Sequence, residues 1–120
     1  MDKNSVYKYF GEVYGFYAEE SIILSLCESV CEELALSARE KADLNDIRLI
    51  ALGAAMVNHR LCMRYFYSGE GVTSFKAGDV TVDSDPATLV SKAKEQLDFA
   101  MKNASSLIED TSFSFKQVRI

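Results

Sequence analysis

The 120-residue chain is poor in the residues from which many active sites are built. It has one histidine, three cysteines and 13 basic residues against 18 acidic ones, for a net charge of −5. Any nucleophile pair of cysteine and histidine must therefore use His59. An odd number of cysteines does not suggest a disulfide framework. The acidic balance disfavours non-specific nucleic-acid binding as the main role of the protein.

The sequence shows no phosphate-binding loop, and we expect no signal peptide. The chain has neither a Gly-x-Gly-x-x-Gly nor a Gly-Lys-Ser/Thr motif, and Gly69-Glu70-Gly71 follows a predicted helix, not a strand. Residues 1–4 lead into tyrosines and charges rather than into the apolar run of a signal peptide. We therefore expect a cytoplasmic protein with reduced cysteines and no cofactor.

One cluster has the residue types of a zinc site, namely Cys27, Cys31, His59 and Cys62. If two helices pair antiparallel about residues 41–42, Cys31 and Cys62 lie roughly 15 Å apart along the helix axis. Zinc ligands must all lie about 2.0–2.3 Å from the metal. We therefore interpret these cysteines as small core residues. A zinc protein, or an enzyme that uses His59 and a cysteine, is the least favoured hypothesis, and no catalytic or metal residue is predicted.

Residues 44–67 contain no proline and one glycine, Gly53, and are predicted to form one long central helix of about 36 Å. Asp43 or Asn45 is expected to cap its start. Two apolar faces predict that neighbours pack on two sides of this helix. The first face comprises Ile47, Ile50, Ala51, Ala54, Val57, Asn58, Leu61 and Tyr65, and the second comprises Leu49, Leu52, Met56, Met63 and Phe66.

Two shorter helices are predicted before it, over residues 5–17 and 19–39. The first carries an aromatic stripe of Tyr7, Phe10, Tyr14 and Tyr17, at spacings of three, four and three. This stripe either packs in the core, which we favour, or forms an arm that docks on a neighbouring subunit. The short connection after residue 39 predicts that the second helix and the central helix are antiparallel neighbours.

The pattern changes after Tyr67. Short β-prone runs around Ala77-Gly78-Asp79 predict a hairpin over residues 72–83. Pro86 follows Asp85 as a helix start, and an apolar stripe continues to about residue 108. Alternation in residues 112–120 indicates a terminal strand, which either joins the hairpin or adds to a neighbouring subunit's sheet. The predicted fold is a single, mainly α domain over residues 1–120: a bundle of three to four helices, a hairpin before the last helix and a short C-terminal strand.

The first third of the chain is acidic, with eight acidic and three basic residues in positions 1–40. Glu28, Glu32 and Glu33 fall largely off the apolar stripe of their helix. They form either a solvated helix face, which is the commoner case, or a surface that meets a basic partner.

The order of these elements resembles the small head–tail connector proteins of tailed bacteriophages and prophages. The resemblance rests on the alanine-rich segment 46–58, on Phe-Lys-Ala-Gly-Asp-Val-Thr-Val at residues 75–82, on the alanine-rich last helix and on the terminal Phe-x-Phe-x-x-Val. The aromatic residues of the N-terminal segment depart from the plain helical start expected for such proteins.

The resemblance implies a ring between the portal and the tail, through which DNA passes without adhering to the acidic protein. It implies contacts with further copies of the chain, formed either unaided or only on the portal, and with portal and tail-side adaptor proteins. It implies neither specific nucleic-acid binding nor a membrane, and places the protein in the host cytoplasm during assembly and then in the virion. The predicted interface residues are Phe75, Lys76, Asp79, Val80, Val82, Phe113, Phe115, Val118 and Ile120. The alternative is a small cytoplasmic helical adaptor or regulatory module that recruits one partner through its acidic first third.

Overall fold

The computed structural model describes residues 1–68, 76–77, 80–81 and 86–109. These residues form four α-helices, two strands of two residues each and one 3-10 turn. The helices are α1 (Lys3–Tyr14), α2 (Glu20–Ser37), α3 (Ile47–Ser68) and α4 (Pro86–Asn103); the strands are β1 (Lys76–Ala77) and β2 (Val80–Thr81), and the 3-10 turn is η1 (Ser105–Leu107). The described part of the chain is mainly helical, as predicted.

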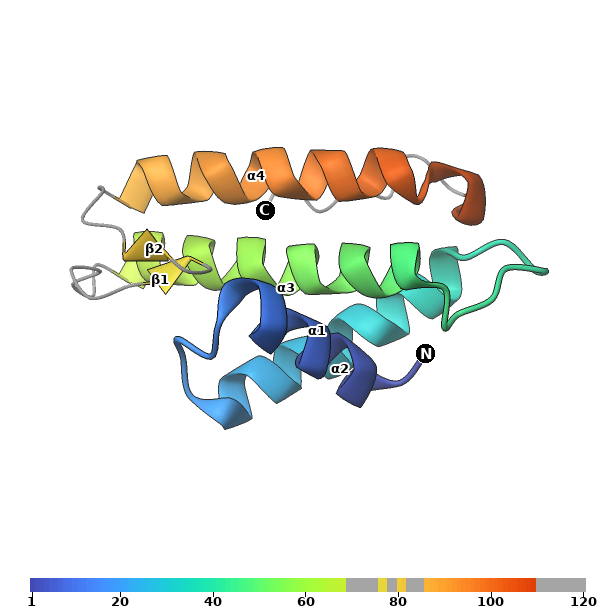
Figure 1. Cartoon of the computed structure of the whole chain (residues 1–120), viewed down its shortest axis with the longest axis horizontal. Coiled ribbons are helices and arrows are strands. Elements are labelled where there is room, and N and C mark those ends of the chain that lie inside the picture. The colour runs from blue at the N-terminus through green and yellow to red at the C-terminus, as the bar shows by residue number, and fades with distance from the viewer. Residues whose placement is uncertain (69–75, 78–79, 82–85, 110–120) are drawn as a thin grey trace.

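Helix α3 is the central element of the bundle. In Figure 1, α4 runs antiparallel along one side of α3, and α1 and α2 lie across its other side. Leu49, Leu52, Val57 and Leu61 are completely buried. Two-sided packing explains why α3 is apolar on two faces, and it confirms the central place predicted for this helix.

The only glycine of α3 lies where side chains of α1 and α2 pack against this helix. A Cβ atom at Gly53 would lie 3.2 Å from Val6 Cγ2 and 3.4 Å from both Leu34 Cδ1 and Val30 Cγ1. The first distance is tighter than an ordinary van der Waals contact between carbon atoms, and the other two are at the lower limit of such contacts. The absence of a side chain at Gly53 therefore lets side chains of α1 and α2 lie close to the backbone of α3.

The start of α3 differs from the prediction. Asp46, rather than Asp43 or Asn45, caps the helix, because its Oδ1 accepts the backbone N–H of Arg48 at 2.9 Å. Asp43 instead closes the preceding turn, where its Oδ1 accepts the N–H of Asn45 at 2.9 Å and its carbonyl accepts the N–H of Asp46 at 3.0 Å. The expected cap was wrong because a separate turn stands between the connection and the helix.

Helix α1 ends at Tyr14, three residues before the predicted end. Gly15 has φ 81° and ψ 157°, a conformation essentially restricted to glycine, and its N–H still bonds the carbonyl of Gly11 at 3.1 Å. The chain then folds back so that the ring of Phe16 covers Gly11, where a Cβ would lie 1.9 Å from Phe16 Cζ. The same ring stacks on Tyr7 at 4.8 Å between centroids.

The aromatic residues of α1 pack within their own chain. Phe10 is completely buried, and its ring centroid lies 5.4 Å from that of Tyr14 and 5.6 Å from that of Tyr17. Tyr17 reaches this cluster from the connection between α1 and α2, not from the helix. The structure therefore supports the core interpretation of the stripe over a docking arm.

Helix α4 begins at Pro86, as predicted, but ends at Asn103 rather than near residue 108. A backbone turn at Ala104 leads into η1 and places Ile108 beside Ala38 in an isolated antiparallel bridge. Backbone hydrogen bonds from Arg39 to Leu107 (2.8 Å) and from Glu109 to Ser37 (2.9 Å) complete this contact. The apolar stripe continued past the helix because residues 107 and 108 pack against the end of α2, not because they are helical.

Strands β1 and β2 pair antiparallel, Lys76 with Thr81 and Ala77 with Val80. The other residues of the predicted hairpin, 72–75, 78–79 and 82–83, lie outside the described residues. The whole predicted C-terminal strand, residues 112–120, lies outside them as well. A hairpin of the predicted length and a terminal strand therefore stay predictions.

Candidate functional site

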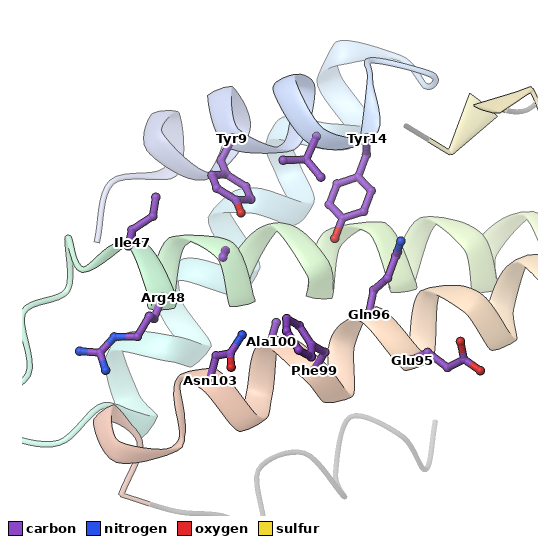
Figure 2. A pocket seen from close by; sticks show the side chains of 11 residues that line it. Tyr9, Tyr14, Ile47, Arg48, Glu95, Gln96, Phe99, Ala100 and Asn103 are labelled. Atoms are coloured by element: carbon purple, nitrogen blue, oxygen red, sulfur yellow. The ribbon is translucent and has the colours of Figure 1, made fainter. Parts of the chain in front are cut away.

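A groove with a volume of about 540 Å³ runs between α1, α3 and α4 (Figure 2). This volume falls within the range of roughly 300–1,000 Å³ that is usual for ligand pockets. Eleven residues line the groove: Tyr9, Val13, Tyr14, Ile47, Arg48, Ala51, Glu95, Gln96, Phe99, Ala100 and Asn103.

Three large apolar side chains of the groove are exposed, and each comes from a different helix. The exposed fractions are 44% for Val13 on α1, 61% for Ile47 on α3 and 67% for Phe99 on α4. In the described part of the chain, only Phe16 and Leu36 are also large, apolar and exposed. An exposed apolar residue is ordinary when it stands alone, but three that converge on one groove indicate a contact surface.

Small residues keep the groove open. Ala51 of α3 and Ala100 of α4 line it, so neither helix sends a large side chain into the space at these positions. Larger residues on the rim, such as Phe99, therefore border an open space that no side chain of the described residues fills.

The charged groups of the groove are few, and Arg48 is already paired. Its Nε donates to Asp46 Oδ1 at 3.0 Å, and its Nη2 donates to Asp46 Oδ2 at 2.9 Å. These hydrogen bonds lower the pKa of Asp46 to about 2, so the pair stays ionised at neutral pH. Glu95 is exposed at the other end of the groove.

The neutral polar groups of the groove can bind a peptide backbone. Figure 2 shows Tyr9 and Tyr14 directed from α1 toward α3 and α4, with Gln96 and Asn103 across from them on α4. Burial raises the pKa of Tyr14 to about 12, so its phenol stays protonated and can donate a hydrogen bond. Phenol and amide groups pair well with the N–H and C=O groups of an extended peptide.

A chain of polar side chains, with buried Asn58 at its centre, reaches the groove at Gln96. The hydroxyl of Tyr17 donates to Asn58 Oδ1 at 2.5 Å, and Asn58 Nδ2 donates to Gln96 Oε1 at 3.4 Å. Burial raises the pKa of Tyr17, so it is a neutral donor. The chain links the α1–α2 connection, α3 and α4, and it holds Gln96 in place at the groove. The sequence analysis placed Asn58 on an apolar face of its helix. A buried amide needs hydrogen-bond partners, and Tyr17 and Gln96 are the partners of Asn58.

The residues of the cluster that was considered, and disfavoured, as a zinc or nucleophile site are buried. His59 is only 4% exposed, and its pKa is lowered first by burial and then by Lys94 and Arg60. Burial raises the pKa of Cys62 to about 11 and that of Cys27 to about 12, which disfavours the reactive thiolate. Among the described residues, no three His, Cys, Asp or Glu side chains are grouped so that they could hold a metal ion.

Two of the three glutamates singled out on α2 are paired within the chain. Glu33 binds Arg60 at 2.6 Å, and Glu28 lies 3.7 Å from Lys3. Glu32 is exposed. The acidic face is therefore partly neutralised by the protein itself.

The predicted interface residues fall mostly outside the described part. Only Lys76 and Val80 are described, as backbone positions on the facing strands β1 and β2. The other seven lie outside it: Phe75, Asp79, Val82, Phe113, Phe115, Val118 and Ile120. That predicted interface stays a prediction.

Sequence reasoning missed the groove, although two signals for it were present. Phe99 and Val13 are apolar but lie off the stripes of their helices, and such residues either contact a further neighbour or remain exposed. Ile47 was assigned to a buried face, and this was wrong, because the first residue of α3 lies at the rim of the groove.

Comparison with known proteins does not extend this description. No family model, curated protein or solved structure matches the chain. Within the described residues, every helix is too short or too polar to cross a membrane.

Proposed function

We propose that this chain is a structural assembly protein that docks on other protein subunits through the groove between α1, α3 and α4. One observation carries the proposal: Val13, Ile47 and Phe99, from three helices, expose apolar surface toward one hollow. Apolar and aromatic anchors at the centre of a contact provide most of the binding energy in protein interfaces. Neutral hydrogen-bonding groups beside them favour a polypeptide as the bound partner.

The groove alone supports a weak contact. Burying the exposed part of each of the three side chains contributes roughly 1–2 kcal/mol at about 25 cal/mol per Å². Association itself costs at least about 4 kcal/mol in lost translational and rotational freedom. A stable complex therefore needs further contacts, and the predicted interface segments 72–83 and 112–120 are the natural source.

The assembly in question is the head–tail connector of a tailed phage or prophage. The resemblance of the sequence to connector proteins supports this assignment, and the mainly helical fold is compatible with it. In a ring, each copy uses one surface to contact the next copy and a different surface to receive the previous one. The groove is one such surface, and portal and tail-side proteins are the other expected partners.

Sedimentation velocity of the chain, alone and with the portal protein of the same phage or prophage, tests this proposal. We expect a complex that Phe99→Lys weakens at least about tenfold, since a charge must then be desolvated in the groove. Leu36→Lys is a matched control, because Leu36 is 89% exposed and does not line the groove. A chain that stays monomeric with the portal at high concentration contradicts the connector assignment.

The second candidate is an adaptor that recruits a basic partner through α2. Glu28, Glu32 and Leu36 are exposed at four-residue spacing and so share one face of this helix. This function predicts a low-order complex that weakens with salt and is abolished by charge reversal at Glu28, Glu32 and Glu33. Loss of binding through Leu36→Lys, with Phe99→Lys silent, would favour the adaptor over the groove.

A further inference from the structure

We propose that Tyr14 and Gln96 determine the specificity of the groove by donating hydrogen bonds to main-chain carbonyl oxygens of an extended, uncharged polypeptide segment of a neighbouring subunit. The inference rests on the proposed function, because it names the chemistry of the partner that the groove receives. What carries it is a buried phenol of α1 and an oriented amide of α4 that line the same groove.

Tyr14 supplies the first donor. Its side chain is only 6% exposed, and Figure 2 shows it directed from α1 toward α3 and α4. The phenol stays protonated, yet no other described residue accepts a hydrogen bond from it. Among the described residues, no polar side-chain atom is both sealed from solvent and unpaired. The unpaired hydroxyl of this otherwise buried side chain is therefore open to the groove that Tyr14 lines.

Gln96 supplies the second donor, and the core sets its orientation. Asn58 Nδ2 donates to Gln96 Oε1 at 3.4 Å, while Asn58 Oδ1 accepts the hydroxyl of Tyr17 at 2.5 Å. A glutamine amide has one oxygen and one nitrogen, so the engagement of Oε1 leaves Nε2 with two hydrogens to donate. Gln96 is exposed and lines the groove, and it therefore offers these N–H groups to a partner.

Two donors select a partner that presents acceptors, and the nearby charges select a neutral one. Glu95 is exposed and lines the groove next to Gln96. The positive charge of Arg48 is offset by its ion pair with Asp46 at 2.9 Å. A carboxylate in the groove would meet the repulsion of Glu95 without an unpaired cation to compensate for it. A carbonyl oxygen avoids this repulsion.

An extended segment has main-chain carbonyls to offer, whereas an α-helix uses all but its last four internally. The α4 residues that line the groove run from Glu95 to Asn103, about 12 Å at 1.5 Å per residue. About four extended residues cover this length at roughly 3.3 Å each. Alternate side chains of such a segment face one side, where the exposed apolar residues of the groove can receive them.

A chemical-shift titration of the isotope-labelled, full-length chain with the capped tripeptide acetyl-Leu-Ala-Leu-methylamide tests the inference. This probe is uncharged, is too short to form a helix, and carries carbonyls beside apolar side chains. We expect saturable shifts of the side-chain amide signals of Gln96. Tyr14→Phe removes only the hydroxyl and should weaken the affinity about three- to tenfold.

A second variant and two controls complete the titration. Gln96→Glu keeps an acceptor for Asn58 but has no donor, so it should weaken the affinity at least about threefold. Tyr7→Phe removes a phenol hydroxyl outside the groove, and Ser91→Glu adds the same charge at an exposed position of α4 outside it. Both controls should bind the peptide as tightly as the parent protein.

Urea denaturation separates specificity from a structural role. The Tyr14 hydroxyl has no hydrogen-bond partner in the described part of the chain, so Tyr14→Phe should leave the urea midpoint unchanged or raise it. A lower midpoint combined with unchanged peptide affinity would make the hydroxyl a structural group and overturn the inference.

The remaining outcomes decide the inference without the portal protein. A peptide that leaves the Gln96 amide signals unshifted up to its solubility limit overturns it. Binding that Tyr14→Phe leaves intact overturns it too, because a partner would then not use this donor. Tighter binding of the same peptide with a free terminal carboxylate would mean that the groove selects an anion. Portal binding is measured separately, so failure of this inference is distinguishable from failure of the connector assignment.

Discussion

Tyr17 donates its hydroxyl hydrogen to Oδ1 of Asn58 at 2.5 Å, across 41 positions of sequence. Asn58 is 2% exposed in the middle of α3, and a buried amide needs hydrogen-bond partners. The bond fastens the α1–α2 connection to the central helix. It therefore couples the position of α1, which forms one wall of the groove, to α3 and α4.

Removal of the Tyr17 hydroxyl should lower the free energy of unfolding. Tyr17→Phe leaves a buried amide oxygen without this donor, at a cost of about 1–3 kcal/mol. Urea denaturation measures it. Tyr7→Phe is the matched control, since it also removes a phenol hydroxyl from the aromatic cluster but breaks no hydrogen bond that the described residues show. Equal stabilities for Tyr17→Phe and the parent protein would mean that the bond contributes nothing.

The architecture was predictable where one physical signal dominated. The two apolar faces of residues 44–67 predicted a central helix, and Pro86 marked the start of α4 because its missing N–H and fixed φ suit a first helical turn. Gly53 could be seen in the sequence, but the close approach of Val6, Val30 and Leu34 to it could not. That approach depends on how three helices pack together.

The candidate site was less predictable than the fold. Whether Phe99 or Ile47 is exposed depends on the side chains opposite, and the alanines at positions 51 and 100 are ordinary core residues in sequence alone. Periodicity places a residue on a face of its helix but does not show whether a neighbour covers that face. The polar pairing of Asn58 is a similar case, because its donor lies in a connection outside any helix.

Gly15 should resist replacement. Its φ of 81° with ψ of 157° belongs to a region that is costly for residues with a Cβ atom. Gly15→Ala should destabilise the protein by about 1–3 kcal/mol, although alanine is the better helix former. Thermal unfolding measures the change. An alanine variant with the parent melting temperature would show that the turn adopts another conformation at no cost.

His59 should make the protein less stable in mild acid. Its pKa is lowered in the folded state, so the unfolded chain binds the proton more tightly. The stability that neutral His59 contributes is fully present above pH 6.5, its ordinary pKa. That stability is lost as the pH falls through the lower pKa that His59 has in the folded protein. The loss is at most about 1.4 kcal/mol per pH unit.

Urea denaturation at pH 7.5 and pH 5.5 checks this prediction, with His59→Gln as the comparison. The variant keeps a polar side chain but has no proton to gain, so its stability should fall less than that of the parent. Asp46 titrates far below this range and does not contribute. Parallel losses in the two proteins would mean that His59 is not the group responsible.

The three thiols should react slowly in the native protein, and at unequal rates. A pKa of about 11 for Cys62 leaves roughly one thiolate in a thousand at pH 8, and Cys27, at about 12, has fewer. Burial also raises the pKa of Cys31, but the N-terminal ammonium partly opposes the rise, and Cys31 lines a pocket together with Met1 and Asp2. Cys31 should therefore react first with an aromatic disulfide reagent.

The rate of thiol release, followed by absorbance at pH 8, separates the three sites. Cys31→Ser should remove the fastest native phase and leave the slower ones, whereas Cys62→Ser should leave the fastest phase intact. In guanidinium chloride all three thiols of the parent should react together, because burial no longer raises their pKa values. Cys62 would instead react first in the folded protein only if the interior between α3 and α4 opened far more often than the burial of Cys62 indicates. That result would contradict the prediction. The rim of the groove would then be only one of several surfaces available to a partner.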